Sequence, residues 1–426
     1  MKMRNIAILS THKQLNERIE QACSGFADDF HPVFLTTEED FVEYLNYELP
    51  EIDIIHYSTK DYDVEHTFDV IKNDPWLHFG GSIVIYEDEN EQELLKRFRG
   101  VNIISMIQIK DLEMYLPKVL HVLQSNRGIL FQRDIHALLQ SNLSGSLKLQ
   151  NDPFNAATYS NLLANFLYNS NLVNLEQKYN FSTALMELLV NAIEHGNCRI
   201  DYNEKKAFLA ENRDIMELIR RKNEDPEIAA RNVHLSYRIT PEKSSFVIRD
   251  EGDGFDWRMY RNRPKGQVST EMLGRGILIA GHYVENMQYN EKGNEVSFDV
   301  DHMNQESNVI PRVFTDQEEL TFKDADVVFS QGEKSSHLFY IISGRFEIIA
   351  NGKKISTLTP ADIFLGEMSF LLNNKRSATV IARGDCTVIR ISKENFINAI
   401  RQEPHYGVFL ARLLAQRLDQ LHETTI

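Results

Sequence analysis

A run of polar side chains at helical spacing is the first place in this sequence that could do chemistry. Residues 181–197 read FSTALMELLVNAIEHGN and place Glu187, Asn191 and His195 at steps of four residues. Side chains four residues apart share one face of an α-helix, so a carboxylate, an amide and an imidazole would form a row. We expect Ser182 to cap this helix. An apolar stripe on the opposite face predicts contact with a core: Leu185, Leu188, Leu189 and Ala192.

Two glycine-rich turns follow this helix. Residues 250–256 read DEGDGFD after a strand-like run, and residues 274–281 read GRGILIAG. Asp250 is a hydrogen-bond acceptor, and glycines beside it let the backbone approach a ligand without a Cβ. A helix that begins with glycines offers free amide groups to phosphates. Either turn alone is a weak signal, because a DxGxG stretch between strands is equally a tight turn.

In this order, residues 181–197, 250–256 and 274–281 resemble the N box and the two glycine boxes of the GHKL nucleotide-binding superfamily. The resemblance implies an ATP site in which Asp250 accepts a hydrogen bond from the exocyclic amine of adenine, so that adenine is preferred to guanine. It also implies that Asn191 ligates Mg²⁺ through its side-chain oxygen. A basic segment between the glycine boxes would form a lid over the triphosphate: Arg258, Arg261, Arg263 and Lys265. The residues expected to bind ATP on this basis are Asn191, His195, Asp250, Gly252, Gly254, Lys265, Gly274, Arg275 and Gly276.

Within that superfamily, the run ELLVNAIEHGN looks most like the anti-sigma-factor serine kinases, because Glu187 stands where histidine kinases usually carry an amide. The resemblance implies that Glu187 is catalytic, as a general base or a water-positioning group beside the γ-phosphate. The plain alternative is that Glu187 makes a structural salt bridge on a solvated helix face. A histidine kinase also needs a dimerising helix with a phosphoacceptor histidine, and the sequence shows no convincing one.

A third cluster lies at residues 364–380, which read FLGEMSFLLNNKRSATV. Arg376 could form a charge-assisted pair with a phosphate, while Gly366 and Ala378 could offer backbone amides. Glu367 could accept a hydrogen bond from a ligand hydroxyl, which in the family named below is that of a ribose. An isolated Glu and Arg nine residues apart would normally form only a surface ion pair, so the flanking residues decide the interpretation.

This run closely resembles the phosphate-binding cassette of cyclic-nucleotide-binding domains, and the short strands expected over residues 314–392 suit their β-roll. The resemblance implies that five residues bind the cyclic nucleotide: Gly366, Glu367, Arg376, Ser377 and Ala378. Ser377 fits the phosphate contact of cAMP receptors, but family members that prefer cGMP also place a hydroxyl there. We favour cAMP, with cGMP as the alternative. A helical stretch over residues 395–421 could close over the base.

The first 125 residues alternate short β-branched runs with amphipathic stretches, which predicts a doubly wound parallel sheet. The expected strands are residues 5–10, 33–35, 52–57, 82–86 and 103–109. Their spacing resembles that of response-regulator receiver domains. Ser10, Thr11 and His56 stand where receivers carry the acids that hold magnesium and accept phosphate, and a divalent cation needs such oxygen ligands. We therefore expect a docking or dimerisation module and no phosphoacceptor.

Length and composition fit three globular domains, since the chain has 426 residues of which 42% are hydrophobic. We place them at residues 1–125, 126–305 and 306–426, with the polar tract 301–311 as a linker. The expected fold is multidomain, α/β and α+β: a receiver-like doubly wound parallel sheet, a GHKL α/β sandwich, and a cyclic-nucleotide-binding β-roll with C-terminal helices. A charged insert of unassigned role lies at residues 201–230.

Charge and cysteine usage limit the partners and the compartment. The formal net charge of -16 opposes contact with nucleic acid or anionic lipid, which both need a concentrated basic surface. Cys23, Cys198 and Cys386 lie far apart and form no CxxC pair, which suits a reducing cytoplasm. No window of about 18 apolar residues predicts a membrane span or a signal peptide. We also expect no DNA-reading helix-turn-helix in this polypeptide.

These observations predict a bacterial signalling protein in which a cyclic nucleotide controls an ATP-binding domain. The first hypothesis is a serine or threonine kinase that acts on a separate protein, an anti-sigma antagonist or a sigma-factor-like regulator, with regulation through the tract 301–311. The second is a binding module that is switched by ATP and cyclic nucleotide without phosphate transfer. A scaffold with one vestigial ligand site is a third alternative. A homodimer is compatible with each of them.

Overall fold

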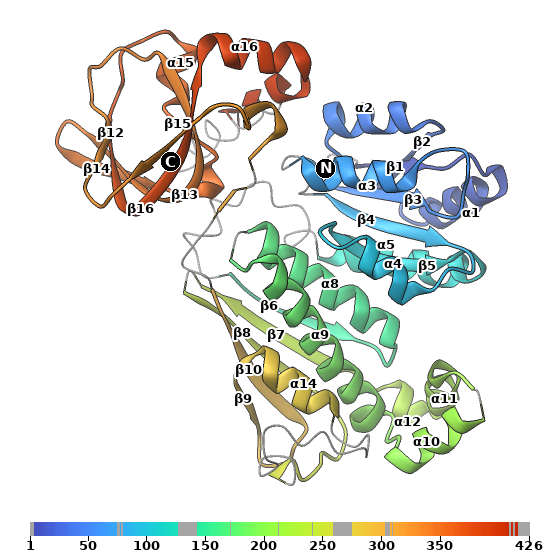
Figure 1. The fold of residues 1–426 in the computed structure, drawn as a ribbon. Coiled ribbons are helices and arrows are strands. Elements are labelled where there is room, and N and C mark those ends of the chain that lie inside the picture. Colours follow the sequence, from blue (N-terminus) through green and yellow to red (C-terminus); the bar gives the residue numbers. More distant parts are fainter. Residues whose placement is uncertain are drawn as a thin grey trace.

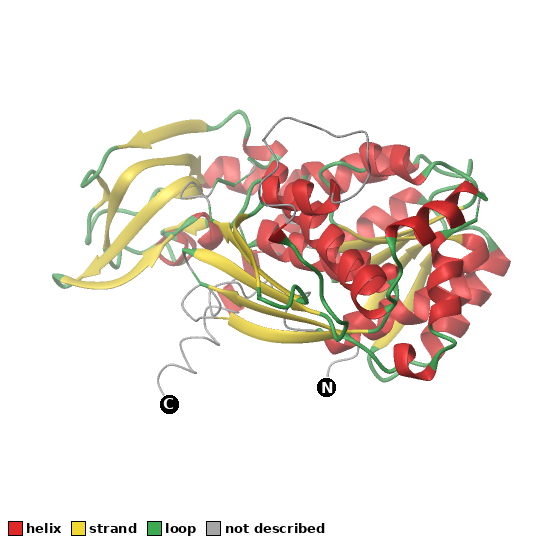
Figure 2. Ribbon diagram, turned by 90° about the horizontal axis from the view of Figure 1, so that it is seen from below, coloured by secondary structure: helices red, strands yellow, loops and turns green. Residues whose placement is uncertain are grey.

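The computed structural model describes residues 4–74, 77, 80–126, 143–170, 172–211, 213–240, 242–258, 275–302, 307–308, 310–408, 410–411 and 414–415. These residues form three β-sheets (Figure 1). A parallel sheet comes first, an α/β unit second, and an antiparallel β-roll with C-terminal helices third, which confirms the expected fold class. In Figure 2 the helices gather around the first two sheets, whereas the β-roll is mostly strand. Within the described residues no helix has the length and apolar character of a membrane span.

The N-terminal sheet has the strand order β2-β1-β3-β4-β5, and all its pairs are parallel. Its strands overlap the runs expected from the sequence: β1 (Arg4–Leu9), β2 (Phe30–Leu35), β3 (Ile52–His56), β4 (Gly81–Tyr86) and β5 (Ile103–Gln108). The helices between and after them are α1 (Lys13–Ser24), α2 (Glu38–Glu48), α3 (Val64–Asn73), α4 (Glu91–Arg97) and α5 (Leu112–Ser125). Strands β3 and β4 are buried along their whole length, as in sheets covered on both faces.

The side chains at the receiver-like positions lie where the strand order reverses, between β1 and β3. Ser10 follows β1, His56 ends β3, and the two strands pair in parallel. The buried ring of His56 has no hydrogen-bond partner for either nitrogen among the described residues, and burial lowers its pKa. The strand order is shared by unrelated doubly wound folds, so the resemblance to receivers stays a prediction.

The second sheet is antiparallel, with the order β6-β7-β8-β10-β9. Its strands are β6 (Leu143–Leu149), β7 (Val233–Ile239), β8 (Lys243–Arg249), β9 (Glu285–Tyr289) and β10 (Glu295–Asp301). Three helices pack on one face: α8 (Pro153–Asn169), α9 (Leu175–Asn191) and α14 (Arg275–Tyr283) (Figure 1). Phe246 of β8 links helix to sheet, because its ring lies 4.8 Å from that of Phe181 and 5.3 Å from that of Phe298.

Helix α9 begins earlier than the sequence suggested. Asn174 and Gln177 form a capping box at its start, so Ser182 lies inside the helix and the expectation that it is the cap is wrong. The Ser182 hydroxyl instead donates to Oδ1 of Asn161 on α8, at 3.0 Å. The stripe of Leu185, Leu188 and Leu189 is buried as expected. After Asn191 the chain continues as a π-helical turn, η2 (Ala192–Asn197).

The charged insert folds into three short helices, α10 (Tyr202–Ala210), α11 (Ile215–Lys222) and α12 (Pro226–Ala229). They stay attached to the π-helical turn, since Lys205 pairs with the buried Glu194.

The expected linker is partly built into the β-roll: Ser307 bridges to Ser343, and the Asn308 side chain donates to the Ile341 carbonyl at 2.8 Å.

The β-roll has the main strand order β11-β16-β13-β14, with β12 on β16 and β15 on β13. Its elements are β11 (Glu318–Phe322), β12 (Val327–Phe329), β13 (His337–Ala350), β14 (Lys353–Leu358), β15 (Phe364–Leu365), α15 (Glu367–Leu371), β16 (Thr379–Ser392) and α16 (Lys393–Gln402). Gly332 lies in a turn at positive φ, and Gly344, also at positive φ, is part of an irregular stretch inside β13. The expected helix 395–421 is interrupted before Pro404, and its part beyond residue 415 lies outside the described residues.

The first two units share a polar and apolar interface along β5 and the 98–102 turn. Strand β5 is at the edge of its sheet, and amide side chains on α8 cover that edge: Asn165 donates to the Ile103 carbonyl at 3.0 Å and Asn161 to the Ile104 carbonyl at 3.2 Å. Lys178 of α9 is buried there. Its ammonium donates to the Val101 carbonyl and to Oδ1 of Asn102, and it faces the rings of two tyrosines: Tyr168 and Tyr179.

Lys178 makes stability depend on pH in a defined direction. Burial lowers the pKa of Lys178 to about 7, so the unfolded chain binds more protons than the folded chain between that pH and the ordinary lysine range. The free energy of unfolding should therefore rise with pH above about 7, by at most about 1.4 kcal/mol per pH unit. Chemical unfolding of the wild type and of Lys178→Met at pH 7, 8 and 9 measures this rise. The Met variant should lack it, and equal pH slopes in the two proteins would contradict the assignment.

Candidate functional site

The last turn of α9 presents the expected catalytic carboxylate and the expected metal-binding amide side by side. Glu187 and Asn191 are half-buried, and Gly276 in the first turn of α14 packs against both. A Cβ on Gly276 would overlap Oε2 of Glu187 and lie 3.4 Å from Nδ2 of Asn191. The helix with glycines at its start therefore reaches the N-box side chains only because position 276 has no side chain.

Oxygen atoms of these two side chains suit a hard cation such as Mg²⁺, so the residues present fit the metal that the resemblance implies. Within the described residues, no cluster of three or more His, Cys, Asp or Glu side chains is arranged to hold a metal ion. The sequence analysis expects a magnesium ion at Asn191 to be held together with nucleotide phosphates.

The expected row of Glu187, Asn191 and His195 does not continue as one α-helix. The π-helical turn η2 begins at Ala192 and changes the rotation per residue, and the His195 ring is exposed with its Nδ1 2.6 Å from the Ile200 carbonyl. Glu187 and Asn191 share a face, whereas the structure does not bring His195 into that row. Single π-helical turns are frequent at functional sites, because they re-aim the residues after them.

Asp250, the expected adenine acceptor, lies at the end of β8 beside the π-helical turn. It is 8% exposed, and the Gly252 amide donates to its Oδ1 at 2.8 Å. A Cβ on Gly196 would overlap the Asp250 carboxylate, and a Cβ on Gly252 would overlap the Gly196 carbonyl oxygen. Burial raises the pKa of Asp250 to about 6, against the lowering effects of the Gly252 amide and Lys292. The carboxylate is thus held between two glycines that cannot be replaced without moving it.

The glycine turn after Asp250 is braced by the β9–β10 connection. Gly254 has φ +80°, and a Cβ there would overlap the Lys292 carbonyl oxygen. The Lys292 ammonium donates to the Gly252 carbonyl at 2.8 Å, and the Asn294 amide donates to the Asp250 carbonyl at 2.9 Å. Gly252 and Gly254 therefore have a close-approach role, although the groups they approach here are protein backbone.

Sequence reasoning missed Asn197, the buried residue that ties these parts together. Its Oδ1 accepts from the Glu251 amide at 2.8 Å, its Nδ2 donates to Oδ1 of Asn151, and its carbonyl accepts from Arg231 at 3.1 Å. Asn197 thereby joins the π-helical turn to the glycine turn. Its place directly after the EHG run was the available signal, but its partners lie about 50 residues away on either side.

Part of the expected ATP site lies outside the described residues: Lys265, Gly274 and the lid residues Arg261 and Arg263. Arg275 starts α14, but its side chain is not among those described. Arg258 is described and exposed; its guanidinium lies over the ring of Trp257 at 5.3 Å and 3.7 Å from Asp256.

The second candidate site is built around Arg376, which is only 4% exposed. Its guanidinium donates to the Gly366 carbonyl at 2.9 Å, to the Ser369 hydroxyl at 3.0 Å and to the His337 carbonyl at 2.6 Å. It also stacks over the ring of Phe329 at 4.1 Å. Burial lowers the pKa of Arg376, and the nearby charges of Glu333 and Glu367 oppose that effect.

The other expected cassette residues surround this guanidinium or lie next to it in sequence. Gly366 has φ +75° at the start of α15, and a Cβ there would overlap Nη1 of Arg376. Glu367 follows it in α15 and is 7% exposed. Ser377 is exposed and Ala378 half-buried, immediately before β16. The structure therefore brings Gly366, Glu367 and Arg376 together as the sequence predicts.

The sequence did not reveal two further neighbours of the guanidinium. Phe329 supplies a ring face, and Ser369 supplies a hydroxyl that also lies 3.2 Å from the Ser335 hydroxyl. Ser369 was within the quoted run, three residues after Gly366, but only the helical turn of α15 aims it at the arginine.

Comparison with known proteins finds two separate matches, one for the residues around each candidate site. Residues 149–300 match the family described as "Histidine kinase-like ATPase domain", and residues 319–403 match "Cyclic nucleotide-binding domain". A "cGMP-dependent protein kinase" of Plasmodium berghei (strain Anka) is 40% identical over 81 residues, 19% of this chain and 9% of that protein. A "Cyclic AMP receptor protein" of Thermus thermophilus is 31% identical over 98 residues, 22% of this chain and 45% of that protein.

Among solved structures, the catabolite activator protein of Thermus thermophilus aligns with 24% sequence identity and a TM-score of 0.25, over 26% of this chain and 55% of that chain. The chain spans less than half the length of either curated relative. The two family matches, in contrast, each contain one of the two sites described above. The chain thus carries a histidine kinase-like ATPase domain followed by a cyclic nucleotide-binding domain.

Proposed function

We propose that this chain is a cyclic-nucleotide-regulated signalling protein that binds Mg²⁺-ATP and phosphorylates a serine or threonine of a separate regulatory protein. The observation that carries the proposal is the packing of Gly276 against both Glu187 and Asn191. It places a helix start, which suits phosphate, beside a carboxylate and an amide, which suit proton transfer and Mg²⁺. The partner in trans is expected to be an anti-sigma antagonist or a sigma-factor-like regulator.

In this mechanism each residue has one task. Asp250 accepts a hydrogen bond from the adenine amine, while Gly252 and Gly254 keep the glycine turn close to the base. Asn191 would contribute an oxygen to a Mg²⁺ ion, which would neutralise charge on the phosphates. Glu187 would accept the proton of the attacking hydroxyl, whose oxygen bonds to the γ-phosphorus while the bond from that phosphorus to the β,γ-bridging oxygen breaks and ADP leaves.

The cyclic-nucleotide site is supported by the electrostatics of Arg376. The acceptors described for its guanidinium are all neutral: two backbone carbonyls and a serine hydroxyl. Arginine does not deprotonate in proteins, and the charges of Glu333 and Glu367 act on the guanidinium although neither carboxylate is among its described acceptors. A cyclic phosphate would be a charge-assisted acceptor for this guanidinium, and Glu367 would accept a hydrogen bond from the ribose hydroxyl. The names of the relatives include both cGMP and cyclic AMP; we favour cAMP and keep cGMP as the alternative.

A binding module without phosphate transfer is the second candidate function. It is favoured by the exposed His195 and by the absence of a recognisable substrate segment within this sequence. In that case ATP and cyclic nucleotide would jointly set the affinity for the partner protein. The Glu187 experiment below separates the two functions.

Arg376→Ala should weaken cyclic-nucleotide binding by more than about tenfold, or about 1.4 kcal/mol, because it removes a charge-assisted phosphate contact. Calorimetric titration with cAMP and then cGMP measures the change. Arg383→Ala is the matched control, since Arg383 pairs with Glu347 on the surface of the same domain and should bind like the wild type. An unchanged affinity in the Arg376 variant would refute the cassette assignment.

Glu187→Gln should lower phosphate transfer by about 100-fold or more while the affinity for a non-hydrolysable ATP analogue stays within about twofold. The measurement is transfer of label from γ-labelled ATP to protein in a clarified extract of the cells that make this chain. Glu176→Gln, in the exposed first turn of the same helix, is the control. Normal transfer by the Glu187 variant would exclude the base assignment, and no transfer by the wild type would favour the binding module.

Asp250 should make ATP binding depend on pH. Because its pKa is about 6 in the free protein, the carboxylate is ionised above that pH and is then a stronger acceptor for the adenine amine. Affinity for the ATP analogue should rise by about tenfold from pH 5 to pH 7 and then level off. Asp250→Asn should lose this rise, and Asp253→Asn, an exposed neighbour, should keep it. The nucleotide phosphates titrate equally in all three proteins, so identical pH profiles would argue against Asp250 as the base acceptor.

A further inference from the structure

The β-roll touches the N-terminal unit through the turn that follows α16. His405, only 5% exposed, places its Nε2 3.2 Å from Oδ2 of Asp74, which caps the C-terminal end of α3. Asp74 also acts on the aromatic core of the β-roll, because after burial its charge is the largest contribution that raises the pKa of both Tyr340 and Tyr406. The end of α3 therefore lies against the third domain's core, and a continuous apolar cluster includes residues of both units.

This contact is connected to the cyclic-nucleotide site within the β-roll. Helix α15 begins with Glu367 and carries Phe370, whose ring meets that of Phe396 on α16 edge to face, with centroids 5.5 Å apart. Helix α16 then leads into the turn that contains His405. A displacement of α15 by a ligand at Glu367 and Arg376 would thus be passed to α16 and to the Asp74 contact.

The same end of α3 is connected to the ATP site. The Lys72 side chain lies over Gly100, which has φ +102°; a Cβ on this glycine would come within 2.9 Å of Cε of Lys72. The Gly100 amide donates to the Tyr179 hydroxyl of α9 at 2.9 Å. Tyr179 and Lys178 anchor the first turns of α9, and the last turn of this helix carries Glu187 and Asn191. The end of α3 therefore lies between the two ligand-binding domains: Asp74 contacts the β-roll, and Lys72 contacts Gly100, which is bonded to α9.

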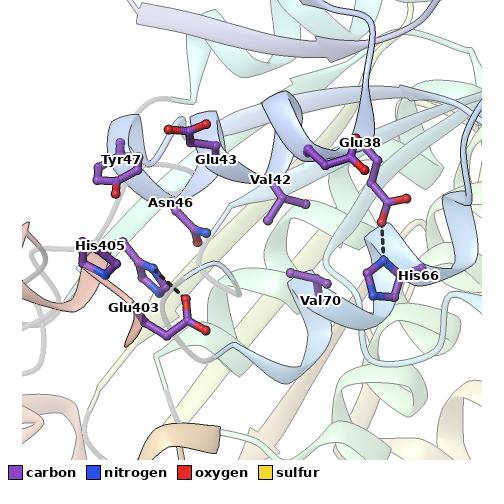
Figure 3. A pocket seen from close by; sticks show the side chains of 11 residues that line it. Glu38, Val42, Glu43, Asn46, Tyr47, His66, Val70, Glu403 and His405 are labelled. Carbon is purple, nitrogen blue, oxygen red and sulfur yellow. Dashed lines mark hydrogen bonds and ion pairs between the residues drawn. The ribbon is translucent and has the colours of Figure 1, made fainter. Parts of the chain in front are cut away.

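The two interfaces of the N-terminal unit differ in extent. Toward the ATPase domain, α8, α9 and α5 all contribute contacts, including the stacked rings of Tyr115 and Phe154 with centroids 4.0 Å apart. Toward the β-roll, a pocket of about 370 Å³ opens beside the Asp74 contact. Side chains of α2 and α3 line it on one side and the 403–405 turn on the other (Figure 3). The relay proposed below requires that the interface beside this pocket rearranges when a ligand binds.

We propose that the N-terminal unit relays cyclic-nucleotide occupancy to the ATP site, through the docking of the 403–406 turn on the end of α3 and of the 98–102 turn on α9. The relay rests on the proposed function in one respect: the chain must bind both ATP and a cyclic nucleotide. It gives a task to the first domain, and it replaces the tract 301–311 as the route of regulation. Part of that tract is tied to the β-roll through Ser307 and Asn308.

The test is thermodynamic coupling in the full-length chain. Calorimetry gives the Kd of cAMP, or of cGMP if it binds more tightly, with and without saturating Mg²⁺ and a non-hydrolysable ATP analogue. In the wild type the analogue should change this Kd by about fivefold or more, the usual lower range of coupling between sites. In Asp74→Ala and in His405→Ala the change should fall below about twofold, while each ligand alone binds within about twofold of the wild type.

Further variants distinguish a relay from general damage. The double variant Asp74→Ala/His405→Ala should be no more impaired than either single variant, because both residues act through one contact. Tyr179→Phe, a nearly isosteric change at the other end of the relay, should also reduce coupling. His66→Gln is the matched control: His66 lines the same pocket but pairs with Glu38 of its own unit, and its coupling should stay intact.

The outcomes separate the two proposals. A wild type that binds neither cyclic nucleotide, or no ATP analogue, defeats the proposed function. Contact variants that keep full coupling overturn the relay and leave the proposed function standing. A wild type that binds both ligands without coupling also overturns the relay, and it leaves the two ligand sites and phosphate transfer standing but not regulation through ATP affinity. A variant with Gly-Ser-Gly-Ser inserted into tract 301–311 adds a direct comparison. If this insertion abolished coupling and the contact variants kept it, the signal would travel through the covalent connection between the domains.

Discussion

The burial of one helix, α9, is the constraint on which the arrangement of this protein depends. Its first turns are fixed against the N-terminal unit by Lys178 and Tyr179, and its last turn carries Glu187 and Asn191. An α-helix held by continuous backbone hydrogen bonds moves largely as a rigid body. In the proposed relay, a shift of the 98–102 turn would therefore reach the residues that face the glycine helix α14.

Lys178 and Arg376 are both buried, and the desolvation of their charges is compensated in different ways. Lys178 lies among carbonyl, amide and tyrosine groups, and its lowered pKa lets it approach neutrality near physiological pH. Arg376 has no such option, because a guanidinium stays charged, and it is held by neutral acceptors and the ring of Phe329. The lysine fits a structural joint between units. The arginine suits the proposed binding of a cyclic phosphate.

Glycines shape both candidate sites because they carry no Cβ atom. Gly276 lets α14 approach Glu187, Gly196 and Gly252 enclose the Asp250 carboxylate, and Gly366 makes room for Arg376. In each case a Cβ would overlap a functional side chain or the backbone beside it. The polar residues supply the chemistry, and the glycines set the distance at which it can act.

The sequence alone determined the fold class and the identity of most polar groups in the two sites. Alternating buried runs specified the parallel sheet, and the order of three motifs was enough to expect Glu187, Asn191 and Asp250 in one place. Local patterns failed where the backbone departs from regular geometry: Ser182 became a mid-helix residue because Asn174 and Gln177 form a better cap, and His195 left its row at a π-helical turn.

Only the tertiary structure decided which distant residues support those sites and how the domains meet. Asn197, Phe329 and Ser369 gain their roles from partners that no periodicity connects to them. The contact between Asp74 and His405 joins residues 331 positions apart, and it depends on burial and packing that form only when the first and third units fold against each other. Local sequence specifies elements and motifs because these rest on short-range hydrogen bonds and side-chain spacing, whereas interfaces rest on shape and charge that many separate segments create together.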